Sequence, residues 1–315
     1  MPTTGGNARM RRLRQDDPLW VGPYAVLAGV DDEAERHRTP DRRYVARSAD
    51  GRRTVLVQVP HPGADPARWA AEAEEARRLA LPGLAPVAEV DGAAVPVWHA
   101  APYTPVLPLT AALAAHGGPL PEAVVRALGA ALARTLATAH ARGVAHAGVS
   151  PAAVLLGVDG PVLACFGAVR AAAPESEQRL GKPGLDPGCL APEQAQGGRP
   201  RPLGDVYALG AVLSYASTGY TVPEREELPA SLREPITACL ARDPARRPSA
   251  ADLAAGLSAP LPLRPQALPD PLAPVPTVLD GPPFPLPARI VAALARQSAG
   301  VLAAPVPAHA QETRP

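Results

Sequence analysis

The residues able to do chemistry are few in this chain, and their spacing suits few reactions. Cys165, Cys189 and Cys239 form neither a CxxC pair nor a Cys/His pattern, so neither a zinc site nor a disulfide framework is predicted. The 315-residue chain holds a single lysine, Lys182, and a single asparagine, Asn7. Any mechanism that needs either residue type elsewhere is therefore excluded.

Two isolated side chains have both a catalytic and a structural interpretation. His146 has the chemistry of a general base, but a lone histidine is more often a core residue. Cys165 has the chemistry of a redox or nucleophilic thiol, but no cation next to it in sequence would lower its pKa. We therefore expect both side chains to be buried packing residues. The acidic residues at 31–35 are flanked by arginines and predict a solvated loop, not a metal site.

Composition and charge restrict the possible partners and compartments. The chain is 47% apolar with a formal net charge of +1, which gives no electrostatic bias toward nucleic acid. The basic cluster at 9–14 is followed by polar residues 15–18 where a secretion signal needs an apolar stretch. Apolar runs at 92–121 and 206–223 are interrupted by prolines or polar side chains, so no transmembrane segment is predicted. We expect a cytoplasmic protein without a nucleic-acid partner.

Hydrophobic periodicity divides the chain into two lobes. Residues 20–102 predict a small β-rich N-lobe with strands at 24–27, 44–47 and 54–59 and one helix that begins at Asp65. Residues 103–258 predict a larger helical C-lobe, with helices at 121–142, 205–218, 229–241 and 249–257. Residues 1–19 are expected to form a flexible basic tail. The predicted fold class is α+β.

The sequence beyond residue 258 has two parts. Residues 259–287 are rich in proline and predict an extended linker. Within 288–315, Ile290, Leu294 and Val301 return at helical spacing, which predicts a short C-terminal helix at 288–302. Our hypothesis is that this helix binds an apolar groove, either on its own C-lobe or on another protein.

Residues 20–257 contain five short motifs in order: HAGVSPAAVLL from His146 to Leu156, CFG at 165–167, APE at 191–193, DVYALG at 205–210 and RDPARRPS at 242–249. They resemble the motifs of a bacterial, actinobacterial-type serine/threonine protein kinase, whose catalytic loop HRDLKPxNVLL corresponds to the first of them. The segments at 165–167, 191–193, 205–210 and 242–249 correspond to its DFG, APE, DVYALG and DPxxRP motifs. Their order and spacing imply a two-lobed protein-kinase-like fold with a Pro-rich C-terminal tail.

The resemblance also identifies the positions where the family's catalytic groups would lie. Gln58, Gly148, Ala153 and Cys165 replace the phosphate-binding lysine, the catalytic aspartate, the metal-binding asparagine and the DFG aspartate. No shift of alignment restores these groups, because the chain's only lysine and only asparagine lie elsewhere. The sequence therefore predicts a pseudokinase with no catalytic residue and no metal site. We expect Gly148→Ala to cost far less stability than Glu193→Ala, unless the backbone at position 148 needs a positive φ.

The implied nucleotide pocket is only partly preserved. The backbone groups of Pro102 and Thr104 remain for adenine, but Leu56 replaces the small alanine expected above the ring. Glu72 remains as the helix carboxylate that would pair with the lysine, so its predicted partner is now the neutral amide of Gln58. We expect no cofactor and weak or no ATP binding.

The resemblance assigns structural roles to five retained residues. Glu193 and Arg247 correspond to a buried ion pair beneath the activation segment, and Asp205 begins a core helix. His146 and Phe166 correspond to core positions of the C-lobe. These residues predict a folded scaffold that does not depend on catalysis.

The functional interpretation is a regulatory or scaffolding module whose partner is a protein, such as an active kinase or its substrate. One alternative is an unorthodox kinase or another ATP-using transferase with the same fold. That enzyme would need a metal ligand such as Asp159, and phosphate contacts from arginines near the pocket. A second alternative is an adaptor that binds its partner through the C-terminal tail.

Overall fold

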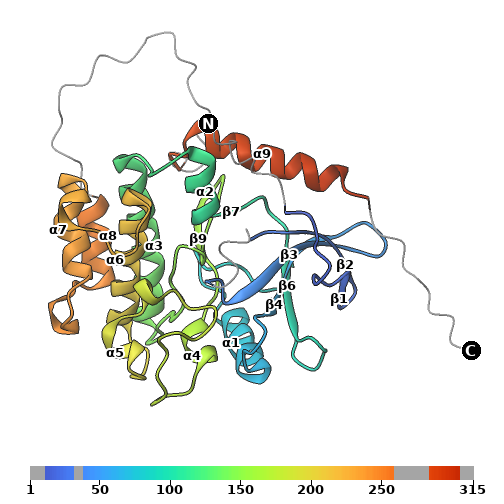
Figure 1. Cartoon of the computed structure of the whole chain (residues 1–315), viewed down its shortest axis with the longest axis horizontal. Coiled ribbons are helices and arrows are strands. Elements are labelled where there is room, and N and C mark those ends of the chain that lie inside the picture. Colours follow the sequence, from blue (N-terminus) through green and yellow to red (C-terminus); the bar gives the residue numbers. More distant parts are fainter. Residues whose placement is uncertain (1–10, 32–37, 259–283, 306–315) are drawn as a thin grey trace, which may run out of the picture.

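Two lobes make up the computed structural model, which describes residues 11–31, 38–258 and 284–305 (Figure 1). The N-lobe contains a six-stranded sheet in the order β1-β2-β3-β4-β6-β5, with antiparallel neighbours throughout. Its elements are β1 (Trp20–Val21), β2 (Tyr24–Gly29), β3 (Asp41–Ser48), β4 (Thr54–Pro60), α1 (Pro66–Leu79), β5 (Glu89–Asp91) and β6 (Trp98–Pro102).

The C-lobe is mainly helical and also contains a small three-stranded sheet in the order β7-β8-β9. Short 3-10 segments occur at Pro187–Cys189, Arg225–Glu227 and Pro244–Arg246. The longer elements are β7 (Leu107–Pro108), α2 (Leu109–His116), α3 (Glu122–Ala141), β8 (Val154–Gly157), β9 (Gly160–Leu163), α4 (Ala168–Ala172), α5 (Pro192–Ala195), α6 (Pro202–Thr218), α7 (Ala230–Cys239) and α8 (Ala250–Ser258).

Local sequence signals explain most element boundaries. Asp65 caps α1 by accepting hydrogen bonds from the amides of Ala67 and Arg68, and Pro66 occupies the first turn. The helices predicted in the C-lobe are present with shifts of only a few residues at most ends. One start is different: α6 begins at Pro202, so Asp205 does not cap it but lies inside its first turn.

The C-lobe core lies where α3 and α6 meet, with α7 and α8 packed outside them. Fully buried leucines of α3 face fully buried apolar residues of α6, and Leu253 of α8 joins the same cluster. Burial of this kind stabilises a helical lobe by roughly 1.5–3 kcal/mol for each large apolar side chain. The C-lobe is thus a rigid base for the loops that face the N-lobe.

Residues 11–19 differ from the expected flexible tail. Arg11 forms a β-bridge with Gly29, and its guanidinium donates to Asp17 at 2.6 Å. The Asp17 carboxylate also accepts from the hydroxyl of Tyr44 at 2.9 Å. These contacts hold the segment against the sheet. The Asp17 carboxylate is buried, and the hydrogen bonds from Arg11 and Tyr44 replace those that it would make with water. Residues 1–10 lie outside the described residues.

The C-terminal helix is present as α9 (Ala288–Ala303) and extends across both lobes (Figure 1). Phe284 and Leu286, just before it, pack against the C-lobe core. Most of the predicted linker, at 259–283, and the end of the chain, at 306–315, lie outside the described residues. The helix therefore docks on its own chain, and it contacts the N-lobe as well as the C-lobe.

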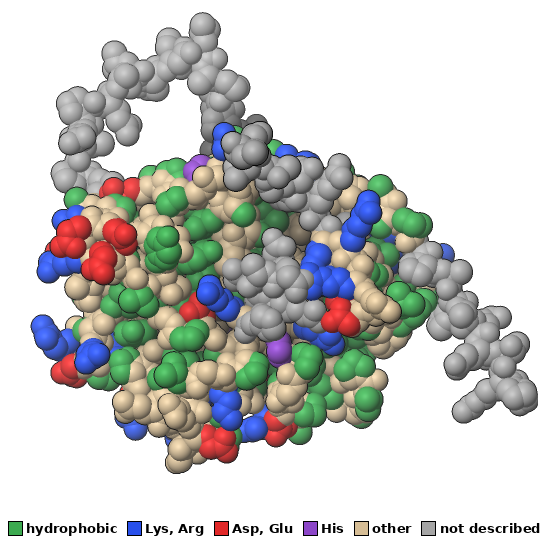
Figure 2. Space-filling view, in the orientation of Figure 1, with side chains coloured by type: hydrophobic (Ala, Val, Ile, Leu, Met, Phe, Trp, Pro, Cys, Tyr) green, Lys and Arg blue, Asp and Glu red, His purple; other side chains and the backbone are tan. Residues whose placement is uncertain are grey.

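The visible surface carries both signs of charge over both lobes (Figure 2). Acidic and basic side chains lie close together over the outer helices of the C-lobe, and apolar side chains are spread between them (Figure 2). No helix in the described ranges is both long and apolar enough to cross a membrane.

Candidate functional site in the cleft between the lobes

The roof of the cleft is formed by the face of β3 and β4 that points toward the C-lobe. Arg43 pairs in register with Gln58, and Val45 pairs with Leu56, so these four side chains share that face. Gln58 is buried, and its Oε1 accepts no hydrogen bond from the described residues. A neutral amide thus occupies the position that the resemblance gives to a lysine.

The space between roof and floor is packed with apolar side chains. Leu56 of the roof, Val106 of the linker between the lobes and Leu155 of β8 belong to one buried cluster, each less than a tenth exposed. Ala153, at the position of the family's asparagine, is fully buried in the same cluster. Apolar side chains of both lobes thus pack together in the region predicted for adenine.

Arg43 fills the part of the cleft nearest the catalytic loop. Its Nε lies 3.0 Å from Oδ2 of Asp31, and its Nη1 donates to the carbonyl of Ala152 in the C-lobe at 2.8 Å. Burial alone would lower the pKa of Arg43, but the Asp31 carboxylate outweighs this effect and raises it. The guanidinium stays charged and its charge is compensated internally. Residues 32–37 of the predicted acidic loop lie outside the described residues.

Glu72 has a different partner from the one expected. Its carboxylate accepts two hydrogen bonds from Arg170, from Nε at 2.8 Å and from Nη2 at 2.7 Å. Arg170 Nη1 also donates to the carbonyl of Ala145, and its guanidinium lies 4.8 Å from the ring centroid of Phe166. A Cβ on Gly167 would overlap the Glu72 carboxylate, so the glycine makes this approach possible. The pair connects α1 of the N-lobe to α4 of the C-lobe.

The position predicted for the catalytic aspartate has no room for a side chain. A Cβ built on Gly148 would overlap the carbonyl oxygen of Cys165 and crowd the Cβ of Ala168. Cys165 directs this carbonyl inward because its backbone is left-handed, with φ at 60°. The expectation that Gly148→Ala costs far less stability than Glu193→Ala is therefore corrected: the substitution requires a backbone shift.

Cys165 is buried, as the sequence predicts. Burial, reinforced by the nearby Asp41 carboxylate, raises the pKa of the Cys165 thiol well above its ordinary value. Asp41 itself accepts a hydrogen bond from the indole of Trp69 at 2.5 Å. The thiol is thus protonated and enclosed, which does not suit a nucleophile.

Asp205 organises the backbone of the catalytic loop. Its buried carboxylate accepts from the amides of His146 and Ala147, both at 2.7 Å, and lies 2.9 Å from His140 Nε2. The His146 ring packs edge-on against Phe166 with centroids 5.6 Å apart. Burial lowers the pKa of His146 to about 4, so the ring is neutral. Asp205, His146 and Phe166 therefore hold the loop in place.

Glu193 and Arg247 form the predicted ion pair. Arg247 Nη1 donates to Glu193 Oε1 at 2.7 Å and Nη2 donates to Oε2 at 2.9 Å. The Arg247 side chain is fully buried, whereas that of Glu193 is 33% exposed, so the pair is less enclosed than expected. Burial raises the pKa of Glu193, but the bonds from Arg247 outweigh it and lower the pKa overall.

Arg179 is a buried organiser that the sequence interpretation missed. It donates to the carbonyls of Val169, Gln194 and Gly198 at 2.8–3.1 Å, and so ties the segment after Phe166 to α5. Nothing in the sequence distinguishes Arg179 from the other basic residues of this segment, Arg170 and Lys182. Arg43 and Arg170 were missed for the same reason, because an arginine in sequence does not reveal its partner.

The remaining predicted residues lie at the edges of the cleft. Pro102 and Thr104 are exposed where the chain passes between the lobes. Asp159 is exposed in the turn between β8 and β9, and its neighbour Gly160 faces Phe284. Within the described ranges, no group of three or more His, Cys, Asp or Glu side chains is arranged to hold a metal ion.

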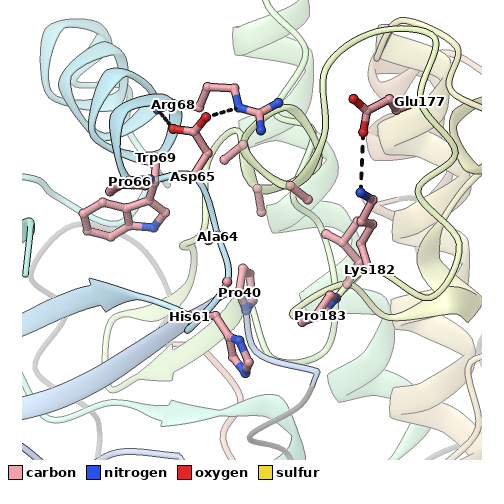
Figure 3. A pocket seen from close by; sticks show the side chains of 15 residues that line it. Pro40, His61, Ala64, Asp65, Pro66, Arg68, Trp69, Glu177, Lys182 and Pro183 are labelled. Atoms are coloured by element: carbon pink, nitrogen blue, oxygen red, sulfur yellow. Dashed lines mark hydrogen bonds and ion pairs between the residues drawn. The ribbon is translucent and has the colours of Figure 1, made fainter.

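An open cavity of about 400 Å³ lies between the start of α1 and the segment that follows α4 (Figure 3). Asp65 and Arg68 form an ion pair on one wall, with 3.0 Å between Oδ2 and Nε. Glu177 and Lys182 face each other on the opposite wall, with 3.5 Å between Oε2 and Nζ (Figure 3). The sole lysine thus lines the mouth of the inter-lobe region, outside the adenine slot.

Comparisons with known proteins identify the relatives of this chain. The probable serine/threonine-protein kinase PkwA of Thermomonospora curvata is 34% identical over 270 residues, which cover 78% of this chain and 35% of PkwA. The serine/threonine-protein kinase AfsK of Streptomyces coelicolor is 32% identical over 272 residues, which cover 78% of this chain and 33% of AfsK. The chain thus spans about a third of the length of these curated relatives. No protein-family model matches it.

Solved structures give the same result at the level of the fold. The crystal structure of the PknI kinase domain of Mycobacterium tuberculosis superposes with a TM-score of 0.54 at 24% identity, covering 75% of this chain and 94% of that domain. A second structure of the same kinase domain gives a TM-score of 0.56 at 25% identity.

Proposed function

We propose that this chain, which has the protein-kinase fold and is related in sequence to actinobacterial serine/threonine protein kinases, acts as a pseudokinase. In this proposal it has lost phosphoryl transfer and serves as a regulatory or scaffolding module in the cytoplasm. Its partner is a protein, either an active kinase or the substrate of one. The sequence relationship to the serine/threonine protein kinases PkwA and AfsK supports this choice of partner.

The observation that carries the proposal is the closure of position 148. Phosphoryl transfer in this fold relies on an aspartate there to accept the substrate proton, and on lysine and metal-binding groups that position the phosphates. The Cys165 carbonyl occupies the space into which any side chain at Gly148 would extend. This steric overlap supports the proposal, because restoring an aspartate at position 148 would also require the backbone to move.

The contents of the cleft support the proposal independently. A nucleotide would have to displace the buried cluster around Leu56 and Leu155, and also the Arg43 guanidinium. Displacing Arg43 would break its bonds to Asp31 and to the Ala152 carbonyl. Leaving a buried charge unpaired typically costs about 3–5 kcal/mol. We therefore expect ATP to bind weakly or not at all.

The first test is phosphoryl transfer with radiolabelled ATP and either magnesium or manganese. We expect no labelling of the protein or of generic substrates above a heat-denatured control. Gln58→Lys should not restore activity, because catalytic groups that act together are not additive. Labelling that is abolished by Cys165→Ala or Gln58→Ala would refute the proposal.

The second test is thermal stability with and without magnesium ATP. A ligand present at 100 times its Kd adds about 2.7 kcal/mol of stability. Each kcal/mol moves the Tm of a 150–250-residue domain by roughly 2–4 °C. We expect no resolvable shift at millimolar ATP, and a magnesium-dependent rise of several degrees would favour an ATP-using enzyme instead.

The third test concerns the partner. Chemical cross-linking in cells of the source organism, followed by mass spectrometry, should recover an active kinase or one of its substrates attached to this chain. Phosphorylation of that substrate should change when the chain is deleted and recover when a Gln58→Ala variant is supplied. Recovery by the wild type alone would mean that the cleft chemistry matters and that the scaffold role is wrong.

A further inference from the structure

The position of α9 across the junction of the two lobes suggests a function for this helix beyond the burial of apolar side chains. The helix lies along the side of the molecule where the two lobes join and extends from α2 toward the N-lobe sheet (Figure 1). Ile290, Ala293, Leu294 and Val301 are buried along one face, each at most 4% exposed. The opposite face is open to solvent, as Val291 at 44% and Leu302 at 81% exposed show. One face of a single helix therefore covers the junction.

Polar contacts attach α9 to three different parts of the chain. Near its start, Arg289 donates to the carbonyl of His116 at the end of α2, at 3.0 Å. In its middle, Gln297 donates to the carbonyl of Val106 in the linker between the lobes, also at 3.0 Å. At its end, Arg47 of β3 donates to the carbonyls of Val301 and Ala304, at 2.5 and 3.0 Å. The helix is thus bonded to the C-lobe, the linker and the N-lobe.

The polar contacts of α9 fix its position on the chain for physical reasons. The last carbonyls of a helix lack partners within it and carry partial negative charge, so a guanidinium placed there is favourable. Gln297 is a buried polar side chain on an otherwise apolar face, and its Nε2 donates to the Val106 carbonyl, whereas its Oε1 accepts no hydrogen bond from the described residues. A shift of α9 by one turn would break this bond and the two bonds to Arg47.

We propose that α9 is a releasable brace that holds the N-lobe and the C-lobe at a fixed angle. Its site is the hinge groove, defined here as the surface formed by α2, Val106 and Arg47, and its occupant is the chain's own α9. The brace is separable because only one face is bound and because a helix of this length is marginal in water without packing. This inference does not depend on the loss of phosphoryl transfer.

Release of the brace would leave the other direct links between the lobes in place. These include Glu72–Arg170, the bond from Arg43 to the Ala152 carbonyl, and the backbone bonds that Leu163 forms with Gly83 and Ala85. The lobes would then pivot about residues 103–106, because the outer side of the hinge is no longer held. A partner that binds α9 or the hinge groove would thereby change the angle between the lobes.

The test is the distance between the lobes in the full chain, measured by spin labels. Labels attached through Asp50→Cys in the N-lobe and Gly256→Cys in α8 lie at exposed positions, and the native cysteines are buried. In an otherwise wild-type protein we expect one narrow distance distribution. With Leu294→Asp we expect release of α9, a rise of about tenfold or more in amide exchange over 288–303, and a broader distribution.

Matched controls separate the brace from general damage. Ala295→Asp adds the same charge on the exposed face and should leave the distance distribution unchanged. Arg47→Ala should broaden the distance distribution, whereas Arg52→Ala, which changes an exposed arginine between β3 and β4, should not. A synthetic peptide of residues 284–305 should bind the Leu294→Asp protein and narrow its distribution again, but should not bind the wild type.

Three results would overturn the proposal. If amides over 288–303 exchange rapidly in Leu294→Asp while the distribution stays narrow, α9 covers the hinge without bracing it. If Leu294→Asp does not fold, α9 is an integral part of the core and is not releasable. If light scattering shows a dimer whose distances require α9 of a second copy in the hinge groove, the occupant is not in cis.

Discussion

The buried contacts beneath the C-lobe loops, called the anchor here, keep more of the residues of the kinase motifs than the cleft above them does. In the anchor, Asp205 still gathers two loop amides, and Glu193 still forms a two-bond pair with Arg247. In the cleft, the positions for chemistry hold Gln58 and Gly148, and the space is packed with protein. The comparison teaches that the contacts that stabilise this fold are physically separate from those that would perform phosphoryl transfer.

The difference follows from where each group finds its partners. Anchor residues bond to other parts of the same lobe, so losing one leaves buried donors unsatisfied and destabilises the fold. Cleft residues of an active enzyme would bond mainly to nucleotide and metal, which contribute nothing to the folded chain without ligand. The proposed pseudokinase does not have this requirement, which agrees with the positions of Arg43 and Leu56 in the cleft.

The largest effect should come from the anchor. Asp205→Ala removes the acceptor of two buried amides and the contact with His140. Each unsatisfied buried donor costs about 1–3 kcal/mol, so we expect a loss of about 3–5 kcal/mol in the free energy of unfolding. Urea denaturation measures it, with the exposed Asp159→Ala as the control within about 0.5 kcal/mol of wild type. An equal stability of both variants would contradict the role given to Asp205.

The next prediction tests whether there is room for a side chain at position 148. Gly148→Ala should lower the free energy of unfolding by about 3 kcal/mol, at the upper end of the usual overpacking cost, because its Cβ meets the Cys165 backbone. Gly256→Ala in α8 has open space around it and should instead stabilise by about 0.5–1 kcal/mol. A neutral Gly148→Ala would mean that the catalytic position is still accessible.

A slightly smaller effect is expected at the ion pair. Glu193→Ala leaves Arg247 buried without its carboxylate, although Arg247 keeps bonds to the carbonyls of Ala241 and Leu203. Since Glu193 is partly exposed, we expect about 2–3 kcal/mol, below the range of about 3–5 kcal/mol for a fully buried pair. Chemical denaturation of Glu193→Ala and Glu193→Gln would show how much of the loss in the free energy of unfolding is due to the charge of Glu193. No loss in either variant would show that the pair is dispensable.

The smallest effect is the pH dependence of stability that is due to buried histidines. Burial lowers the pKa of His146 from 6.5 to about 4, and that of His99 also to about 4. Below pH 6.5 the unfolded chain binds protons that the folded chain does not, so stability falls as the pH drops toward 4. The slope is about 1.4 kcal/mol per pH unit for each histidine.

His146→Leu should remove one of these contributions and keep the packing against Phe166. Its loss of stability between pH 6.5 and pH 5 should be less steep than that of the wild type by about 1.4 kcal/mol per unit. Urea midpoints measured at several pH values provide the test. Identical slopes would show that His146 is already protonated in the folded protein.

Several features were predictable because they depend on residue type and local order. A single lysine outside the pocket excludes a lysine at position 58, whatever the fold does. The strand at 54–59, the helix that begins after Asp65 and the order of the C-lobe helices follow from periodicity and capping, which act over a few residues. The order of a β-rich lobe and a helical lobe was therefore accessible from periodicity, and the kinase-like fold from the resemblance of the ordered motifs.

The tertiary structure alone decided the partners of the charged and buried groups. Glu72 lies 98 residues from Arg170, Arg43 lies 109 from Ala152, and Gln297 lies 191 from Val106. Local periodicity contains no information about which side chains meet at such separations, because the meeting depends on how whole lobes pack. The sequence by itself thus determined which chemical groups this protein lacks. Long-range packing determined that an arginine and leucines fill the cleft, that a carbonyl closes position 148, and that α9 crosses the hinge.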